Sequence, residues 1–120
     1  MRKYENSFRD LIVWQKAKDL TLTVYRYTKN FPPEEKYGLT SQLRRSSSSI
    51  MANLAEGNER KIKADRVHFF VMAKSSLTEV DCWFELAHEL GYLNDEEYER
   101  CLEFVNKTAF LLIRLTGAQK

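Results

Sequence analysis

Residues that interrupt helices are scarce in this chain, and that scarcity constrains its fold more than any other feature. Only 4 glycines and 2 prolines occur among 120 residues, and the prolines are adjacent at Pro32-Pro33. β-Sandwiches and barrels need turn residues at short intervals, so this chain favours long helices over short strands. With 43% hydrophobic and 12% aromatic residues, it also carries too much apolar material for a disordered segment. Its length is that of one domain.

Apolar residues recur at spacings of three and four along four segments, which is the pattern of amphipathic helices. These segments predict helices over about residues 11–28, 40–57, 65–90 and 95–116. Because the connections between the segments are short, consecutive helices are expected to run antiparallel. The predicted fold is therefore all-α, a single up-down-up-down antiparallel four-helix bundle that forms one domain over residues 1–120.

Local signals mark the ends of the first two helices. Phe31 precedes Pro32-Pro33, and a residue before proline avoids the helical region, so the first helix ends there. Pro33 followed by two acidic residues suits the start of a short extra turn. Thr40 is the predicted N-cap of the second helix, because its hydroxyl can accept a hydrogen bond from a free amide of the first turn.

The turn between the third and fourth helices carries stronger signals. Gly91 is placed to end the third helix in the left-handed conformation that helix C-termini often adopt. Asn94 and Glu97 match the spacing of a capping box, in which each side chain bonds the other's backbone amide. Leu93 and Tyr98 are placed for the accompanying hydrophobic staple.

The second predicted helix is unusually polar. A stripe of polar residues recurs along it at the spacing of core residues: Gln42, Arg45, Ser49, Asn53 and Glu56. We interpret this stripe as a buried structural network, in which Arg45 needs a carboxylate partner and Glu79 is the candidate. The run Ser46–Ser49 is a poor helix former, but its small side chains allow close approach of a neighbouring helix.

No set of residues in the sequence matches a catalytic or metal site. Glu85-x-x-His88 is half of a di-iron motif, but the residues before His68 supply no second copy. We therefore expect His88 to be a surface histidine in an acidic patch, and Cys82 and Cys101 to be small buried hydrophobes. Nucleophile motifs and phosphate-binding loops are also absent from the sequence. The sequence thus predicts no catalytic residue, no metal, no cofactor and no enzymatic activity.

Charge is distributed unevenly along the chain. Residues 1–74 hold 15 Lys and Arg against 8 Asp and Glu, whereas residues 75–120 hold 4 against 9. This asymmetry fits a basic face for nucleic acid, complementary faces for self-association, or simply an uneven solvated surface. The candidate phosphate contacts come from the second helix and the loop after it: Arg44, Arg60, Lys61, Lys63 and Arg66.

Apolar residues outside the main stripes point to self-association. The third helix carries a second apolar seam with Phe69, Met72 and Trp83, and the fourth has Phe104 and Leu111 away from its main stripe. One small bundle cannot bury all of these side chains, so we expect a homo-oligomer with these five residues at its interface. The N-terminal residues lack the apolar core of a signal peptide and no apolar run approaches about 20 residues, so a cytoplasmic protein without a membrane partner is expected.

Several motifs resemble those of a known family. They are Phe8-x-Asp10-Leu11-x-Val13-Trp14-Gln15, Phe31-Pro32-x-x-Glu35-x-Tyr37-Gly38-Leu39-Thr40-x-Gln42-Leu43, Asn53-Leu54-Ala55-Glu56-Gly57 and Leu90-Gly91-Tyr92-Leu93. Together they are similar to the small bacterial four-helix-bundle proteins encoded in intervening sequences of large-subunit ribosomal RNA genes. The accessory variability proteins of diversity-generating retroelements are relatives of that family.

The resemblance implies a ring of identical subunits, typically a homopentamer, without catalysis. It further implies RNA or DNA as a partner, together with a reverse transcriptase in the retroelement branch or a ribosomal component in the other. The position before Ser76 is usually glycine in these proteins and is Ser75 here, so looser packing is expected at that point.

Two functions of different classes stay open at the level of the sequence. The first is a nucleic-acid-binding accessory or scaffold whose basic residues converge around a ring. The second is a self-assembling or protein-binding module without affinity for nucleic acid, in which the polar stripe and the aromatic residues serve packing alone. Binding of nucleic acid across a range of salt concentrations separates the two, because phosphate contacts are strongly salt-dependent.

Overall fold

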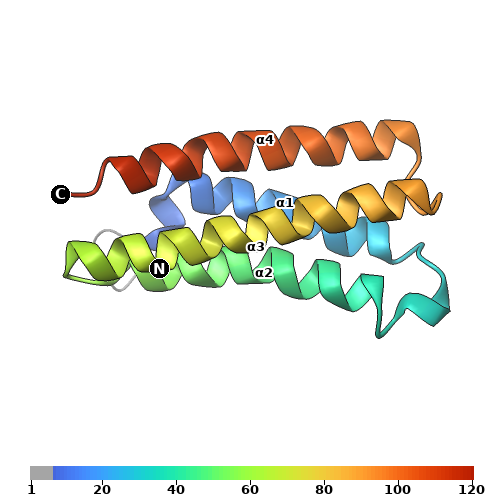
Figure 1. Ribbon diagram of the computed structural model, residues 1–120, viewed down its shortest axis with the longest axis horizontal. Coiled ribbons are helices and arrows are strands. Elements are labelled where there is room, and N and C mark those ends of the chain that lie inside the picture. Colours follow the sequence, from blue (N-terminus) through green and yellow to red (C-terminus); the bar gives the residue numbers. More distant parts are fainter. Residues whose placement is uncertain (1–6) are drawn as a thin grey trace.

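The computed structural model describes residues 7–120, which form one antiparallel bundle of helices (Figure 1). Its elements are the 3-10 helix η1 (Phe8–Asp10), α1 (Ile12–Thr28), the 3-10 helix η2 (Pro33–Glu35), α2 (Leu39–Asn58), α3 (Lys63–Glu89) and α4 (Asp95–Gly117). The four long helices alternate in direction, which confirms the predicted up-down-up-down fold. Every predicted helix boundary lies within two residues of the observed one.

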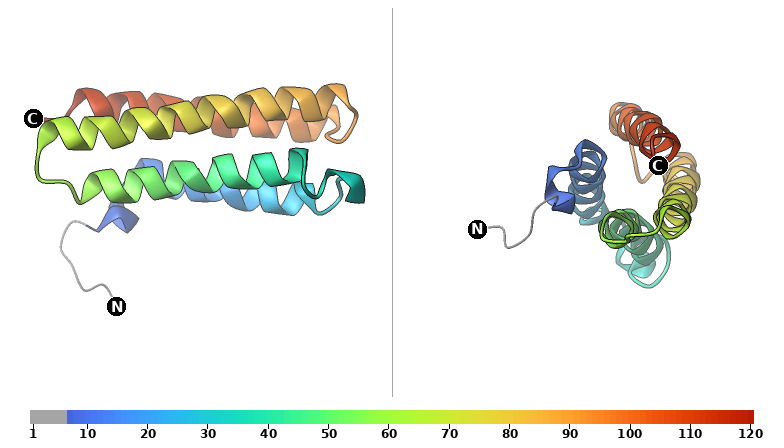
Figure 2. Two further views of the ribbon diagram at one scale, coloured as in Figure 1. Left: turned by 60° about the horizontal axis from the view of Figure 1, so that its bottom comes forward. Right: turned by 90° about the vertical axis from the view of Figure 1, so that its left-hand side faces the viewer.

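The helices pack in a cyclic order, so each one contacts its neighbours in sequence and α4 closes the bundle against α1. Figure 2 shows this arrangement end-on, with α1 and α3 on one diagonal and α2 and α4 on the other. The α1–α2 connection and the α3–α4 connection consequently lie at one end of the bundle. The α2–α3 connection and the end of α4 lie at the opposite end.

The turn between α3 and α4 forms as its sequence predicts. Gly91 has a φ of +79°, and its amide donates to the carbonyl of His88 at 3.0 Å while the amide of Tyr92 donates to the carbonyl of Ala87 at 2.9 Å. These two bonds make a Schellman motif, which is the standard way to end a helix on glycine. The capping box follows directly, with the Glu97 amide donating to Asn94 Oδ1 at 2.8 Å and the Asn94 amide donating to Glu97 Oε1 at 3.0 Å.

The start of α2 differs from the prediction, because Thr40 is not its N-cap. The helix begins at Leu39 after Gly38, and Thr40 is buried inside the first turn. Glu35 supplies the cap from η2, accepting a hydrogen bond from the Leu39 amide at 3.1 Å. A Cβ on Gly38 would lie 2.6 Å from this same Glu35 oxygen, so glycine leaves room for the capping carboxylate. The predicted extra turn after Pro32 is confirmed as η2.

The core is a continuous apolar layer contributed by all four long helices. Its largest fully buried side chains include Leu20 of α1, Ile50 of α2, Phe70 and Phe84 of α3 and Leu112 of α4. The α2–α3 pair is closely packed at Gly57, where a Cβ would lie 2.7 Å from Phe70 Cε1. The serine-rich part of α2 also contacts α3, because Ser49 accepts a hydrogen bond from Ser76 at 3.1 Å.

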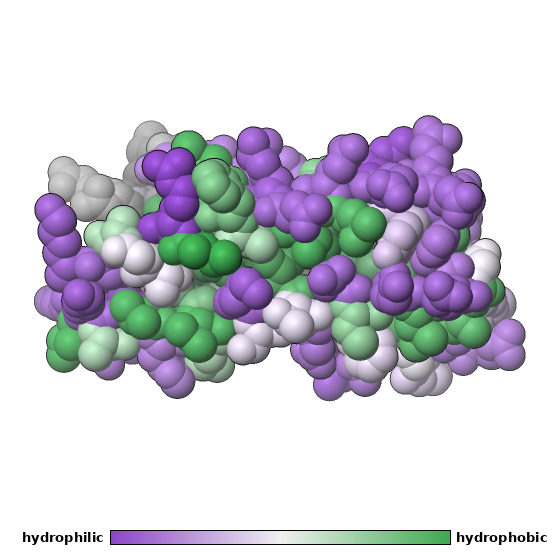
Figure 3. All heavy atoms as spheres, turned by 45° about the horizontal axis from the view of Figure 1, so that its top comes forward, coloured by the Kyte–Doolittle hydropathy of each residue, from purple (hydrophilic) through white to green (hydrophobic). Residues whose placement is uncertain are grey.

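Polar and apolar side chains are unevenly placed on the surface over α1, α3 and α4. Figure 3 shows apolar side chains over the left and centre of this face and along its lower right, and hydrophilic ones concentrated over its upper right. Exposed apolar residues near the end of α4 include Phe110 and Ile113. Ser75 is also exposed and lines a hollow of about 300 Å³ between α3 and α4. No helix within residues 7–120 has the length and apolar character that crossing a bilayer requires.

Candidate nucleic-acid interface

The turn between α2 and α3 presents three exposed cationic side chains. Arg60 and Lys61 lie in the turn itself, and Lys63 is the first residue of α3. The Arg60 guanidinium lies 4.7 Å from the ring centroid of Phe69, which positions it by a cation–π contact. We call these three residues the α2–α3 basic turn.

Arg66 holds the α2–α3 basic turn in place and does not itself face solvent as a free cation. Its Nη1 donates to the carbonyls of Lys61 at 2.8 Å and Arg60 at 3.2 Å, while Nε donates to Gln119 Oε1 at 2.7 Å and Nη2 to the Lys120 carbonyl at 2.8 Å. The four bonds join the turn to the segment after α4. Arg66 was predicted to contact phosphate, but its donors are engaged within the chain, so we assign it a structural role instead.

Arg44 does not join the other basic residues that the sequence singled out. It lies 14 residues before the end of α2, which corresponds to about 21 Å along the helix axis. These residues were grouped because they are close in sequence, but the length of α2 separates them in space. The candidate basic residues therefore form two sites, one in the α2–α3 turn and one near the start of α2, at opposite ends of the bundle.

A second site lies around Arg44, where α1, η2 and α2 meet. A hollow of about 390 Å³ is lined there by Tyr25, Lys36, Tyr37, Thr40, Ser41, Arg44, Arg45 and Ser48. We call it the Tyr37 pocket. Tyr37 is 87% exposed, and the Lys36 ammonium lies 5.4 Å from its ring centroid. The sequence analysis did not identify Tyr25, Lys36 or Tyr37 as site residues, although a basic–aromatic pair such as Lys36-Tyr37 was a visible signal.

Arg44 is held rigidly in the wall of the Tyr37 pocket. Its Nε donates to Thr28 Oγ1 at 2.9 Å, and the guanidinium carbon lies 4.7 Å from the ring centroid of Tyr25. Thr28 is itself buried and donates to the carbonyl of Val24 at 2.7 Å. Within residues 7–120, the structure records no protein acceptor for the two Nη groups, so they are available to a ligand.

The polar stripe of α2 is not a buried network within the chain, which corrects our interpretation of the sequence. Gln42, Arg45 and Glu56 are exposed, as is Glu79 on α3, and no ion pair joins Arg45 to Glu79 in the described part of the chain. Of the five residues of the stripe, Ser49 is half-buried and Asn53 is buried. Asn53 donates to the carbonyl and the hydroxyl of Ser49, at 3.0 and 3.2 Å.

The five residues predicted at an oligomer interface are all incompletely covered by their own chain. Met72 is 40% exposed, while Phe69, Trp83, Phe104 and Leu111 are half-buried. Trp83, Phe104 and Leu111 also pack against the core, so they contribute to the bundle itself. The structure adds exposed apolar residues to the outer surface of α3 and α4, namely Val71, Phe110 and Ile113.

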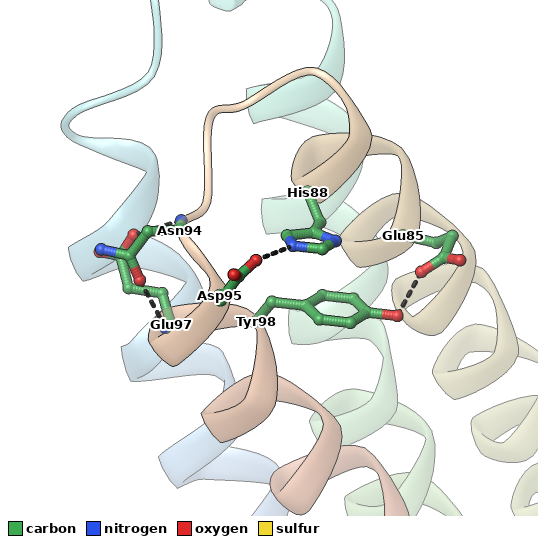
Figure 4. Close-up of polar contacts among 6 residues, drawn as sticks. All are labelled: Glu85, His88, Asn94, Asp95, Glu97 and Tyr98. Atoms are coloured by element: carbon green, nitrogen blue, oxygen red, sulfur yellow. Dashed lines mark hydrogen bonds and ion pairs between the residues drawn. The ribbon is translucent and has the colours of Figure 1, made fainter.

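The residues of the half di-iron motif form a structural cluster at the α3–α4 corner (Figure 4). His88 is half-buried; its ring stacks on Tyr98 at 4.1 Å, and its Nε2 lies 2.7 Å from Asp95 Oδ1. The Tyr98 hydroxyl donates to Glu85, and this hydrogen bond raises the pKa of Tyr98 to about 12. Within residues 7–120 no group of three or more His, Cys, Asp or Glu side chains has a geometry that would hold a metal ion. The cluster joins the end of α3 to the start of α4.

The two cysteines differ, and one of them contradicts the prediction. Cys101 is fully buried in the core, as expected, and burial raises the pKa of its thiol to about 12. Cys82 was also expected to be buried but is exposed on α3. The Cys101 thiol therefore stays protonated near neutral pH and packs as an apolar group in the core.

Comparisons with known proteins agree with this geometry. A family model described as 23S rRNA-intervening sequence protein matches residues 9–114. A solved structure of a protein of unknown function, from the S23 ribosomal protein family of Bacteroides thetaiotaomicron VPI-5482, has the same fold with a TM-score of 0.81. The two sequences are 23% identical, and the similarity covers 89% of this chain and 96% of that one. No curated protein matches the sequence.

Proposed function

Because this chain belongs to the 23S rRNA-intervening sequence protein family, we propose that it is a nucleic-acid-binding accessory protein without catalytic activity. It acts as a ring of identical bundles and binds RNA through the α2–α3 basic turn. A ribosomal component or a reverse transcriptase is the kind of protein partner that such an accessory serves.

The observation that carries this proposal is the α2–α3 basic turn. Arg60, Lys61 and Lys63 are exposed side by side, and the four hydrogen bonds of Arg66 fix the backbone that presents them. Cations presented on a fixed backbone lose less conformational entropy on binding than cations on a mobile turn. Such a set contacts phosphates without reading bases, so its binding is salt-dependent and tolerant of sequence.

A ring of identical subunits strengthens this weak contact. Each copy contributes one basic turn, and linked sites gain affinity through their effective concentration without any new contact. The exposed apolar residues of α3 and α4, among them Met72, Phe110 and Ile113, supply the surface on which neighbouring copies pack.

Reversal of the basic turn tests the proposal. The variant Arg60→Glu, Lys61→Glu, Lys63→Glu should lose affinity for single-stranded RNA, and the slope of log affinity against log salt should fall by about 2, since each lost phosphate contact contributes about 0.7. Fluorescence anisotropy with a labelled oligonucleotide at several salt concentrations measures both quantities.

A matched control separates this effect from a change in net charge. The variant Lys16→Glu, Lys18→Glu, Lys107→Glu alters the same number of charges on α1 and α4, outside the basic turn, and should keep most of the parent's slope. Equal slopes for the parent and the basic-turn variant would refute the proposed contact. Absence of RNA binding by the parent would favour the alternative, a self-assembling module without affinity for nucleic acid.

A further inference from the structure

The geometry points to the Tyr37 pocket as a site for an unpaired nucleotide of a nucleic-acid strand. The base stacks on Tyr37, and the adjacent phosphate binds Arg44 and Arg45. This inference rests on the proposed function and deepens it, because it assigns a second, chemically different contact at the opposite end of the bundle from the α2–α3 basic turn.

Size and lining suit a nucleotide. The hollow of about 390 Å³ falls within the range of about 300–1,000 Å³ typical of small-molecule sites. Its wall carries two tyrosine rings, three cationic side chains and three hydroxyl groups of Thr40, Ser41 and Ser48. Aromatic faces beside cations are the combination with which proteins bind single-stranded nucleic acid.

Arg44 is preorganised to bind a phosphate. Thr28 accepts from its Nε at 2.9 Å and Tyr25 supports its guanidinium plane at 4.7 Å, so the side chain is already fixed before a ligand arrives. The remaining Nη groups form the planar fork that matches two phosphate oxygens. Arg45 follows in sequence and lines the same pocket, so it adds a second charge to the site.

Among the described residues, no carboxylate lines the pocket to oppose an anion. The nearby Glu35 is engaged elsewhere, since its Oε1 accepts from the Leu39 amide at 3.1 Å and its Oε2 accepts from the Tyr92 hydroxyl at 2.9 Å. These bonds direct that carboxylate toward the start of α2 and the α3–α4 turn. Cationic side chains therefore determine the electrostatic potential inside the pocket, and aromatic rings supply its stacking surface.

The exposure of Tyr37 indicates a preference for unpaired bases. Its ring is 87% exposed at the rim of the pocket, so it contributes little to the core of this chain. A base in a duplex is covered by its neighbours and offers only its edge, whereas an unpaired base offers a face for stacking. Duplex binding should consequently depend on the cations alone.

Binding of short oligonucleotides by the full chain tests the inference. Anisotropy is measured with labelled ten-nucleotide rU and dT strands and with an RNA duplex, for the parent, Tyr37→Ala and the control Tyr37→Phe. Tyr37→Ala should weaken single-strand binding about 5- to 150-fold, the range for loss of one stacked base. Tyr37→Phe keeps the ring and should stay within about 2-fold of the parent.

The duplex should bind the parent and Tyr37→Ala equally. If Tyr37→Ala lowers the affinities for rU and dT equally, the pocket contacts only the base and the phosphate. A larger loss of affinity for rU supports an added contact to the ribose hydroxyl. Unchanged single-strand affinity in Tyr37→Ala, equal losses on single strand and duplex, or a change in molar mass without a change in affinity would overturn the inference. In those cases RNA binding by the parent still upholds the proposed function, whereas a parent that binds neither strand nor duplex refutes both.

Discussion

Several residues in this protein have structural roles that their residue type alone does not predict. Arg66 looks like a phosphate ligand in the sequence and instead fixes the α2–α3 turn through four hydrogen bonds. Glu35 looks like a surface acid and instead caps α2 and bonds Tyr92. Gly57 stands in the last turn of α2, where it also leaves room for Phe70 of α3. In each case contacts made in the folded bundle decide the role.

The replacement Gly57→Ala should destabilise the protein. Its Cβ would lie 2.7 Å from Phe70 Cε1 and 2.9 Å from Phe69 Cβ, and Phe70 is buried in the core with little room to move. Overpacking of this kind costs about 1–3 kcal/mol, which exceeds the gain of about 1 kcal/mol from replacing glycine in a helix. Thermal unfolding followed by circular dichroism measures the change.

Gly117→Ala is the matched control for that experiment. It lies in the last turn of α4 with nothing within 4 Å of the added Cβ, so its melting temperature should equal or exceed that of the parent. A Gly57→Ala variant as stable as Gly117→Ala would show that α2 and α3 can separate at this point without cost.

At the scale of elements, residues close in sequence determine where a helix ends, but they do not determine which of its faces is buried. The α3–α4 turn combines a Schellman motif on Gly91 with a capping box on Asn94 and Glu97, all from residues close in sequence. The faces of α2 are different. Its polar stripe has the spacing of a core face, yet most of it lies outside the bundle because Ser47, Ile50 and Leu54 occupy the inside.

Loss of the capping box should weaken the start of α4. Asn94→Ala removes the acceptor for the Glu97 amide and should cost about 1 kcal/mol, or about 3–6 °C in melting temperature for a domain of this size. Asn94→Asp retains a capping oxygen and should stay close to the parent. Equal melting temperatures for Asn94→Ala and Asn94→Asp would mean that the stacked His88–Tyr98 pair holds this corner without the cap.

At the scale of the whole molecule, one bundle covers its apolar residues incompletely. Within residues 7–120, eleven large apolar side chains are exposed, including Met72 and Val71 on α3 and Phe110 and Ile113 on α4. The acidic residues of the second half of the chain lie along α3 and α4, whereas basic residues gather in the α2–α3 turn and near the start of α2. Apolar surface and opposite charge on different helices suit packing between copies, which is the basis of the proposed ring.

The mass in solution tests this assembly. Light scattering at micromolar concentration should give a multiple of the 14.2 kDa chain mass. Met72→Lys, at a half-exposed position of the predicted interface, should shift the mass toward one chain, whereas Leu22→Lys on α1, diagonally across the bundle, should not. A parent that scatters as a single chain would rule out the oligomer.

The sequence alone was sufficient for the all-α bundle, the helix boundaries, the α3–α4 cap and the family. These features depend on periodicity, on capping interactions within a few residues, and on motifs that can be read directly along the chain. Thr40 was misassigned because Glu35 competes for the start of α2 from outside the helix.

Only the tertiary structure decided which surfaces the candidate residues share. Periodicity shows that a helix has two faces but not how the helix is rotated against its neighbours, so the polar stripe could not be placed inside or outside beforehand. Proximity in sequence grouped Arg44 with Arg60, although the rigid length of α2 holds them apart. The same geometry brings Tyr25 of α1 against Arg44 of α2, because antiparallel packing joins the end of one helix to the start of the next. Sites made by such contacts exist only once the helices have packed.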